Sequence, residues 1–134
     1  MIIVYTHVTA DILHCGHLQY LRSAKLLGDK LIVGVATDEA LIEIKPRLIM
    51  PFRERLAIVS SLKFVDLAIP QKEYAPYKNV SNVGADILVE SESHDEGMLA
   101  EGRLLMAKLG GRMVILPYHD EQSSTRIKEK IKNG

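Results

Sequence analysis

The sequence predicts an α/β fold: a Rossmann-like, doubly wound sheet of five parallel strands with helices on both faces. Two observations predict it. Short apolar blocks rich in β-branched residues recur along the chain, as is typical of strands that helices cover on both faces. Stretches with helical spacing separate these blocks and give the βαβ rhythm of right-handed crossovers. The 134 residues suit one core and contain no linker or repeat, so we expect residues 1–134 to form a single domain.

The predicted strands share runs of Ile, Leu and Val that are too short for helices. In chain order the predicted strands are 2–5, 31–36, 65–69, 87–89 and 113–116.

The predicted helices carry apolar residues three or four positions apart, which places these residues on one face. Glycine follows three of the helices, at Gly28, Gly84 and Gly110, and glycine is the usual residue just after a helix end. In chain order the predicted helices are 17–27, 53–62, 77–83, 98–109 and 124–132.

A basic loop at 43–51 connects the second strand to the next helix. It carries Lys45 and Arg47, and Pro46 and Pro51 stiffen it. Such a loop at the carboxyl edge of a parallel sheet is placed to cover a ligand. The alternative is a solvated connection without a role in binding.

Charge and composition exclude several classes of function. Seventeen basic and seventeen acidic side chains cancel, so no overall field attracts nucleic acid or anionic lipid. No apolar run approaches the ~20 residues of a membrane span, and the N-terminus lacks the features of a signal peptide. The single cysteine, Cys15, fits a reducing compartment. We therefore expect a cytoplasmic protein that binds neither nucleic acid nor membrane.

Two histidines, His14 and His17, lie at the first strand-to-helix turn with Gly16 between them. A helix that opens there points free N–H groups and its positive dipole end at an anion, and imidazoles beside it can act on a polyphosphate. Two alternatives stay open. The pair could simply cap the helix, or His7, His14, Cys15 and His17 could bind a metal ion, although a second ligand pair of structural zinc spacing is missing.

A second anion site is predicted at 122–126, where the last helix opens. Ser123, Ser124 and Thr125 are hydroxyl residues favoured at helix N-caps, so capping is the simple interpretation. The same hydroxyls and the N–H groups behind them can also bind phosphate, and Arg126 adds a planar cation. Two such openings at one sheet edge favour a polyphosphate ligand.

The acidic run at 90–96 follows the fourth predicted strand. A solvated loop is its simplest interpretation. Its carboxylates, Glu92 among them, could instead recognise ribose or sugar hydroxyls or help to hold hydrated Mg²⁺ on the phosphates.

Taken together, these segments resemble the cytidylyltransferase-like nucleotidyltransferases, the Rossmann-like superfamily with the H-x-G-H motif. The resemblance rests on 9–17, which is similar to the family segment G-x-F-D-x-x-H-x-G-H, and it extends over the whole chain through 24–29, 37–39, Arg55 and 64–66. Through 110–117 and 123–125 the chain is most similar to the adenylyltransferase domain of ADP-heptose synthases, which act in lipopolysaccharide core biosynthesis. Glycerol-3-phosphate cytidylyltransferases are a close second.

The resemblance implies that a phosphorylated small molecule attacks the α-phosphorus of ATP or CTP and releases pyrophosphate, with Mg²⁺ bound through the substrate phosphates. It also implies a homodimer. By the same resemblance, His14, His17 and Lys45 act on the triphosphate, with Arg47 beside Lys45, and Arg55 secures the loop or the acceptor phosphate. The remaining predicted binding residues are Thr9, Ala10, Asp11, Gly16, Glu92, Ser123, Ser124, Thr125 and Arg126.

Several residues depart from the family pattern. Val8 replaces a glycine, Ala10 an aromatic residue, and Glu121 a further glycine, while Ser91-Glu92 stand where a glycine-aspartate pair is usual. These departures keep two alternatives open beside an adenylyltransferase. One is a cytidylyltransferase that uses CTP and glycerol 3-phosphate, and the other is a nucleotide-binding regulator without turnover.

Overall fold

Five parallel strands form one sheet in the order β3-β2-β1-β4-β5, which confirms the predicted Rossmann-like α/β fold. The computed structural model describes residues 1–45, 47–117 and 124–134. The strands are β1 (Ile3–Val8), β2 (Lys30–Ala36), β3 (Leu67–Gln71), β4 (Ile87–Ser91) and β5 (Arg112–Leu116).

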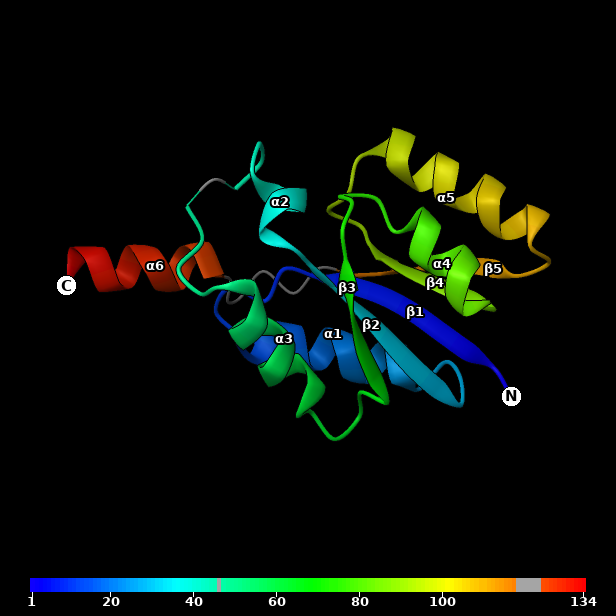
Figure 1. Ribbon diagram of the computed structural model, residues 1–134, viewed down its shortest axis with the longest axis horizontal. Coiled ribbons are helices and arrows are strands. Elements are labelled where there is room, and N and C mark those ends of the chain that lie inside the picture. The colour runs from blue at the N-terminus through cyan, green and yellow to red at the C-terminus, as the bar shows by residue number, and fades with distance from the viewer. Residues whose placement is uncertain (46, 118–123) are drawn as a thin grey trace.

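Helices cover both faces of this sheet (Figure 1). One face carries α1 (Cys15–Lys25) and α3 (Phe52–Ser60), and the opposite face carries α4 (Tyr77–Val83) and α5 (Glu96–Lys108). The short α2 (Asp38–Leu41) follows β2, and α6 (Ser124–Asn133) extends from one end of the molecule. No helix in the described ranges is both long and apolar enough to cross a membrane.

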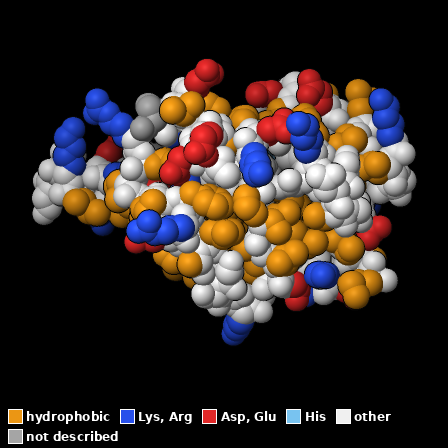
Figure 2. Space-filling model, in the orientation of Figure 1, with side chains coloured by type: hydrophobic (Ala, Val, Ile, Leu, Met, Phe, Trp, Pro, Cys, Tyr) orange, Lys and Arg blue, Asp and Glu red, His pale blue; other side chains and the backbone are white. Residues whose placement is uncertain are grey.

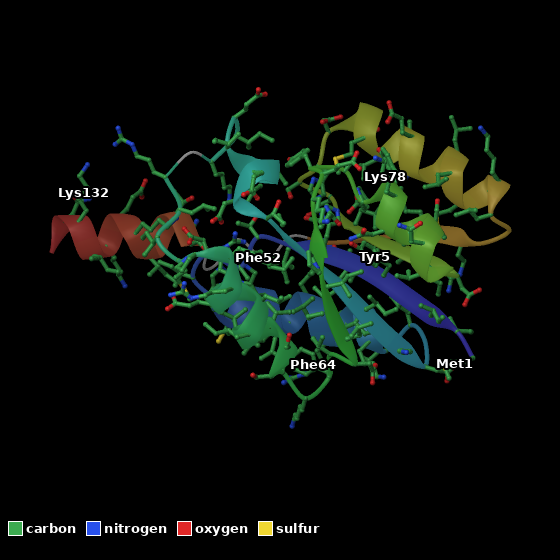
Figure 3. All side chains as sticks on the ribbon, in the orientation of Figure 1. Met1, Tyr5, Phe52, Phe64, Lys78 and Lys132 are labelled. Atoms are coloured by element: carbon green, nitrogen blue, oxygen red, sulfur yellow. The ribbon has the colours of Figure 1, made fainter. Side chains whose placement is uncertain are left out.

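The two faces of the sheet enclose separate hydrophobic clusters because successive strand residues point to opposite sides. On β1, Val4 packs into the cluster under α1 and α3, whereas Tyr5 packs into the one beside α4 and α5. Figure 3 labels Tyr5 and also Phe52 and Phe64, which pack against the first cluster. The polar side chains at the strand ends also alternate between the two faces of the sheet. Only those on the same face can contact one another.

Several element bounds differ from the sequence prediction: β1 continues to Val8 and β4 to Ser91, beyond the predicted ends at 5 and 89. The third strand runs over Leu67–Gln71 instead of 65–69, because Val65 still belongs to the turn after α3, where its N–H bonds to Leu62 O. The strand then continues through Pro70, which an edge strand tolerates since one side of it needs no ladder hydrogen bonds. The short helix α2, capped by Thr37, was not predicted.

Hydrophobic side chains gather on the surface over β3 (Figure 2). Leu67 on this edge strand is 44% exposed, and Ile58 on the adjacent α3 is 39% exposed. Charged side chains lie mainly around this patch in the same view.

Candidate active site

Both ends of the chain contribute to one pocket at the carboxyl ends of the strands. The cavity has a volume of about 280 Å³, and its lining includes His14 and His17 from the start of α1 together with Ser124 and Thr125 from the start of α6. Lys45 from the loop before α3 lines it as well. The predicted meeting of the two helix openings is therefore present in the structure.

The two histidines cap α1 with their Nδ1 atoms. His14 Nδ1 accepts a hydrogen bond from Gly16 N at 3.0 Å, and His17 Nδ1 accepts one from His14 N at 3.2 Å. An Nδ1 that accepts carries no proton, so each neutral ring carries its proton on Nε2. Helix capping and ligand binding are therefore compatible, because the Nε2–H groups remain available as donors.

Burial lowers the pKa of both imidazoles. The pKa of His17 falls to about 4, first because of its burial and then because His14 and Lys45 lie nearby. Burial also lowers the pKa of His14. Near neutral pH both rings are uncharged, and they can donate to phosphate oxygens as neutral N–H groups.

Asp11, predicted to bind the ligand, joins parts of the surrounding backbone in the structure. It is 2% exposed and accepts hydrogen bonds from Ile49 N and Met50 N, at the end of the basic loop, and from Lys128 Nζ on α6. Burial alone would raise the pKa of this carboxyl, but the bonds from Lys128 and the two backbone amides outweigh it and lower the pKa. A second bond, from Ser124 Oγ to Ile12 O at 3.0 Å, also joins α6 to the first turn.

Arg55 is fully buried in the same region. Its guanidinium donates to the carbonyl oxygens of Thr9, Ala36 and Met50 and pairs with Asp38 Oδ1 at 2.6 Å. Of the two roles that the resemblance implied, securing the loop agrees with these contacts. No part of the side chain is exposed for an acceptor phosphate to reach.

The remaining predicted residues divide into two groups. Thr9 and Gly16 line the pocket, whereas Ala10, Glu92, Arg126 and the loop residue Arg47 are not among its lining residues. Ala10 is buried and has a left-handed backbone with φ 56°, which is strained for a residue other than glycine. Ser123, Glu121 and Pro46 lie outside the described residues.

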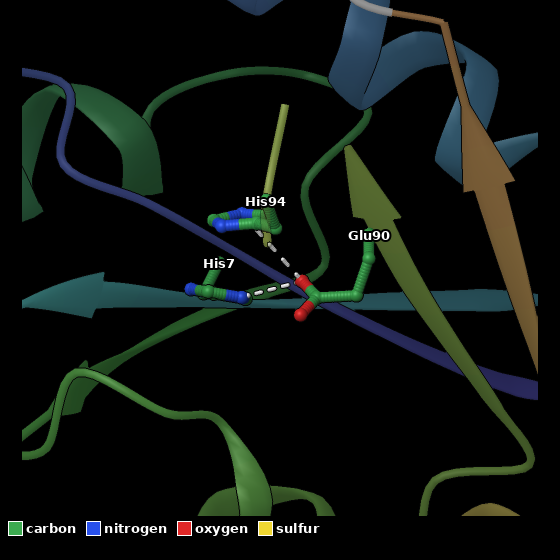
Figure 4. Close-up of side chains that lie close together, drawn as sticks. All are labelled: His7, Glu90 and His94. Atoms are coloured by element: carbon green, nitrogen blue, oxygen red, sulfur yellow. Dashed lines mark hydrogen bonds and ion pairs between the residues drawn. The ribbon is translucent and has the colours of Figure 1, made fainter. Parts of the chain in front are cut away.

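Sequence reasoning identified the far end of the pocket only in part, through the run 90–96 with its possible role in ligand recognition. His7, Gln71, Tyr74 and His94 line it. Behind them lies Glu90, whose Oε1 is 2.6 Å from His7 Nε2 and 3.9 Å from His94 Nε2 (Figure 4). His7 therefore lies with Glu90 and His94, and not with His14, Cys15 and His17 as the sequence-based metal hypothesis required.

A signal for this end was present in the sequence. His7, Gln71 and Glu90 each lie one or two positions beyond the predicted end of a strand. The carboxyl ends of neighbouring parallel strands meet at one sheet edge, where such folds bind ligands. Polar residues just past three apolar blocks thus predict a shared site. This prediction requires that each strand extends one or two residues beyond its apolar run.

Known proteins are similar to this chain over most of its length. A family model described as Cytidylyltransferase-like matches residues 8–130. The bifunctional protein HldE of Vibrio vulnificus is 37% identical over 134 residues, which is 98% of this chain and 28% of the relative. HldE of Yersinia pestis is 34% identical over the same shares. The chain thus spans only 28% of the length of these curated relatives.

Solved structures show the same fold. The crystal structure of a lipopolysaccharide core biosynthesis protein from Thermoplasma volcanium superposes with a TM-score of 0.72 at 37% identity and covers 89% of this chain and 97% of that one. A protein of unknown function from Archaeoglobus fulgidus, at 22% identity and a TM-score of 0.67, supports the fold alone. Because the family model matches residues 8–130, this chain belongs to the cytidylyltransferase-like family of nucleotidyltransferases.

Proposed function

We propose that this chain transfers AMP from ATP to a sugar phosphate or a similar polyol phosphate and releases pyrophosphate. The observation that carries the proposal is that the starts of α1 and α6 line the same pocket. There His14 and His17 present Nε2–H donors, and Lys45, Ser124 and Thr125 stand around the same cavity. Hydrogen-bond donors and one cation that converge on a cavity suit a chain of phosphoryl groups.

In the proposed reaction an oxygen of the acceptor phosphate attacks the α-phosphorus of ATP. The new O–P bond forms as the bond from the α-phosphorus to the oxygen that bridges to the β-phosphorus breaks, and pyrophosphate leaves with that electron pair. The side chains contribute by alignment and by donating hydrogen bonds to the oxygens that gain charge. Mg²⁺ bound through the substrate phosphates would offset part of this charge.

Two similarities favour ATP and a sugar phosphate over CTP and glycerol 3-phosphate. The C-terminal part of the sequence resembles the adenylyltransferase domain of ADP-heptose synthases more than it resembles the cytidylyltransferases. The Thermoplasma volcanium protein, 37% identical, is described as a lipopolysaccharide core biosynthesis protein. We also propose a homodimer, on family resemblance alone, and sedimentation equilibrium of the purified chain tests it.

Pyrophosphate release tests the function. The chain is incubated with Mg²⁺, with ATP or CTP, and with a panel of phosphorylated sugars and polyols. We expect release with ATP that depends on the acceptor and that CTP supports poorly. Faster release with CTP and glycerol 3-phosphate would identify a cytidylyltransferase. Tight binding of ATP without release for any acceptor would identify a regulator that retains only the binding site.

A further inference from the structure

Glu90 on β4 is a buried carboxylate with one oxygen unpaired. The residue is 1% exposed, and its Oε2 has no hydrogen-bond partner within 1–45, 47–117 and 124–134. Its other oxygen contacts the two imidazoles of His7 and His94, which stack with ring centroids 5.4 Å apart (Figure 4). Because a buried acceptor without a partner costs free energy, this arrangement points to a positively charged or hydrogen-bonding occupant.

The separations of the possible ligand atoms fit one metal ion. One atom from each of His7, Glu90 and His94 lies within 4.8 Å of the others. Zinc binds imidazole nitrogen at ~2.0–2.1 Å and carboxylate oxygen at ~2.0–2.2 Å, so tetrahedral ligand atoms stand roughly 3.3 Å apart. The observed separations of 2.6 and 3.9 Å from Glu90 Oε1 lie on either side of that value. Small side-chain shifts would bring both nitrogens to it.

We propose that His7, Glu90 and His94 bind a divalent transition-metal ion of the zinc class. Two imidazoles and a carboxylate favour zinc or a similar ion, whereas Mg²⁺ prefers ligand sets made of oxygen. This ion is therefore distinct from the Mg²⁺ expected on the triphosphate. His7 and His94 also line the pocket, so a fourth coordination position faces the cavity and can take a water or an oxygen of a bound molecule.

In the metal-free protein a proton occupies the place of the ion. Asn79 Nδ2 donates both to Pro70 O and to Tyr5 OH, so the tyrosine donates its own proton to Gln71 Oε1 at 2.6 Å. The amide nitrogen of Gln71 then faces Tyr74 O and His7 Nδ1. Since His7 Nδ1 faces a donor, the ring carries its proton on Nε2 and donates it to Glu90 Oε1.

Metal binding must therefore change the tautomer of His7. The proton leaves Nε2, which becomes a ligand, and is carried on Nδ1, so no net proton is released from this ring. Gln71 then has to present its Oε1 to Nδ1–H, so it gives up its hydrogen bond to Tyr74 O and no longer accepts from Tyr5 OH. Two neutral hydrogen bonds are weak beside coordination by three protein ligands, so the exchange favours the bound ion.

Metal titration of the full chain tests this proposal without nucleotide. The protein is stripped with a chelator and titrated with Co²⁺, followed by its visible absorption, and then with Zn²⁺ in competition. We expect one ion per chain with the absorption of nitrogen and oxygen coordination. Loss of a partner outside the coordination sphere already costs ~10–100-fold in affinity, so removal of a ligand should cost ~100-fold or more.

The decisive variants are Glu90→Gln, which is nearly isosteric, and His94→Asn, which lies in the turn before α5. Both should lose at least ~100-fold in affinity. The His14→Asn/His17→Asn double variant should still bind one ion per chain, because its histidines lie outside the cluster. Circular dichroism of the metal-free variants checks that they fold. If Glu90→Gln does not fold, the metal affinity of His94→Asn decides the test. Wild-type affinity in His94→Asn, no coordination absorption in the wild type, or loss of binding in the double variant would each overturn the proposal.

Discussion

Lys128 on α6 forms an ion pair with the buried carboxylate of Asp11, although the two residues are 117 positions apart in the chain. The same carboxylate accepts the backbone N–H groups of Ile49 and Met50. One side chain therefore joins the turn before α1, the end of the basic loop and the C-terminal helix. These are the three segments that supply His14 and His17, Lys45, and Ser124 and Thr125 to the pocket.

We predict that Asp11→Asn loosens all three segments. An amide cannot replace a charged acceptor of three donors, and breaking a buried ion pair destabilises a protein by about 3 kcal/mol. Urea unfolding measures this loss. Because the binding segments are released together, KM for the nucleotide should rise more than kcat falls. Lys128→Met and the Asp11→Asn/Lys128→Met double variant complete a thermodynamic cycle, and strictly additive effects would show that the pair is not coupled.

His17→Asn should slow pyrophosphate release by ~100-fold or more, because it removes the Nε2–H donor from the reacting phosphates. An asparagine oxygen can still accept from His14 N, so the cap of α1 is expected to persist. Gln19→Ala, an exposed site on the same helix, is the matched control and should retain the wild-type rate. A normal rate in His17→Asn would remove His17 from the reaction.

His17 should also make stability depend on pH. Its pKa is about 4 in the folded chain, since burial and the nearby His14 and Lys45 lower it, against 6.5 for an ordinary histidine. Between these values the unfolded chain binds the extra proton, so the free energy of unfolding should fall as the pH falls from 6.5 to 4. One proton gives a slope of up to about 1.4 kcal/mol per pH unit. Urea unfolding of the wild type and of His17→Asn is measured over this range. The wild type should lose more unfolding free energy than the variant as the pH falls, and an equal loss in both would contradict the shift.

Gly34 on β2 should not tolerate a side chain. A Cβ atom there would lie 1.9 Å from the hydroxyl oxygen of Tyr5 and 2.8 Å from Gln71 Oε1. Gly34→Ala should destabilise the fold by about 1–3 kcal/mol, as measured by urea unfolding. Tyr5→Phe removes the closest atom, so the double variant should recover part of this loss. No recovery would show that the clash lies elsewhere.

The sequence allowed the fold to be predicted because short apolar blocks alternate with amphipathic stretches in nearly every segment. It also located the two helix openings, since His14, His17, Ser124 and Thr125 follow predicted strands. Periodicity could not define where strands end, because polar residues such as His7, Gln71 and Glu90 continue a strand without an apolar signal. For this reason His7 and Gln71 were not placed beside the run 90–96 at the far end of the pocket.

The roles of Asp11 and Arg55 also depended on tertiary structure. Both lie in segments that resemble the family, and the resemblance implied that Asp11 binds the ligand and that Arg55 secures the loop or the acceptor phosphate. Both charged groups are buried and form hydrogen bonds with backbone groups of Thr9, Ala36, Ile49 and Met50. No pattern in the sequence shows that these backbone groups lie close together. Local sequence determined which charged residues lie near the pocket, and long-range packing determined which of them face into it.

A crystal structure of the chain with Mg²⁺ and a non-hydrolysable ATP analogue tests the central claim most directly. The account predicts that one triphosphate lies between α1 and α6, with phosphate oxygens within hydrogen-bond distance of the Nε2 atoms of His14 and His17 and near the hydroxyls of Ser124 and Thr125. A nucleotide bound elsewhere, or with its phosphates turned away from both helix starts, would contradict it.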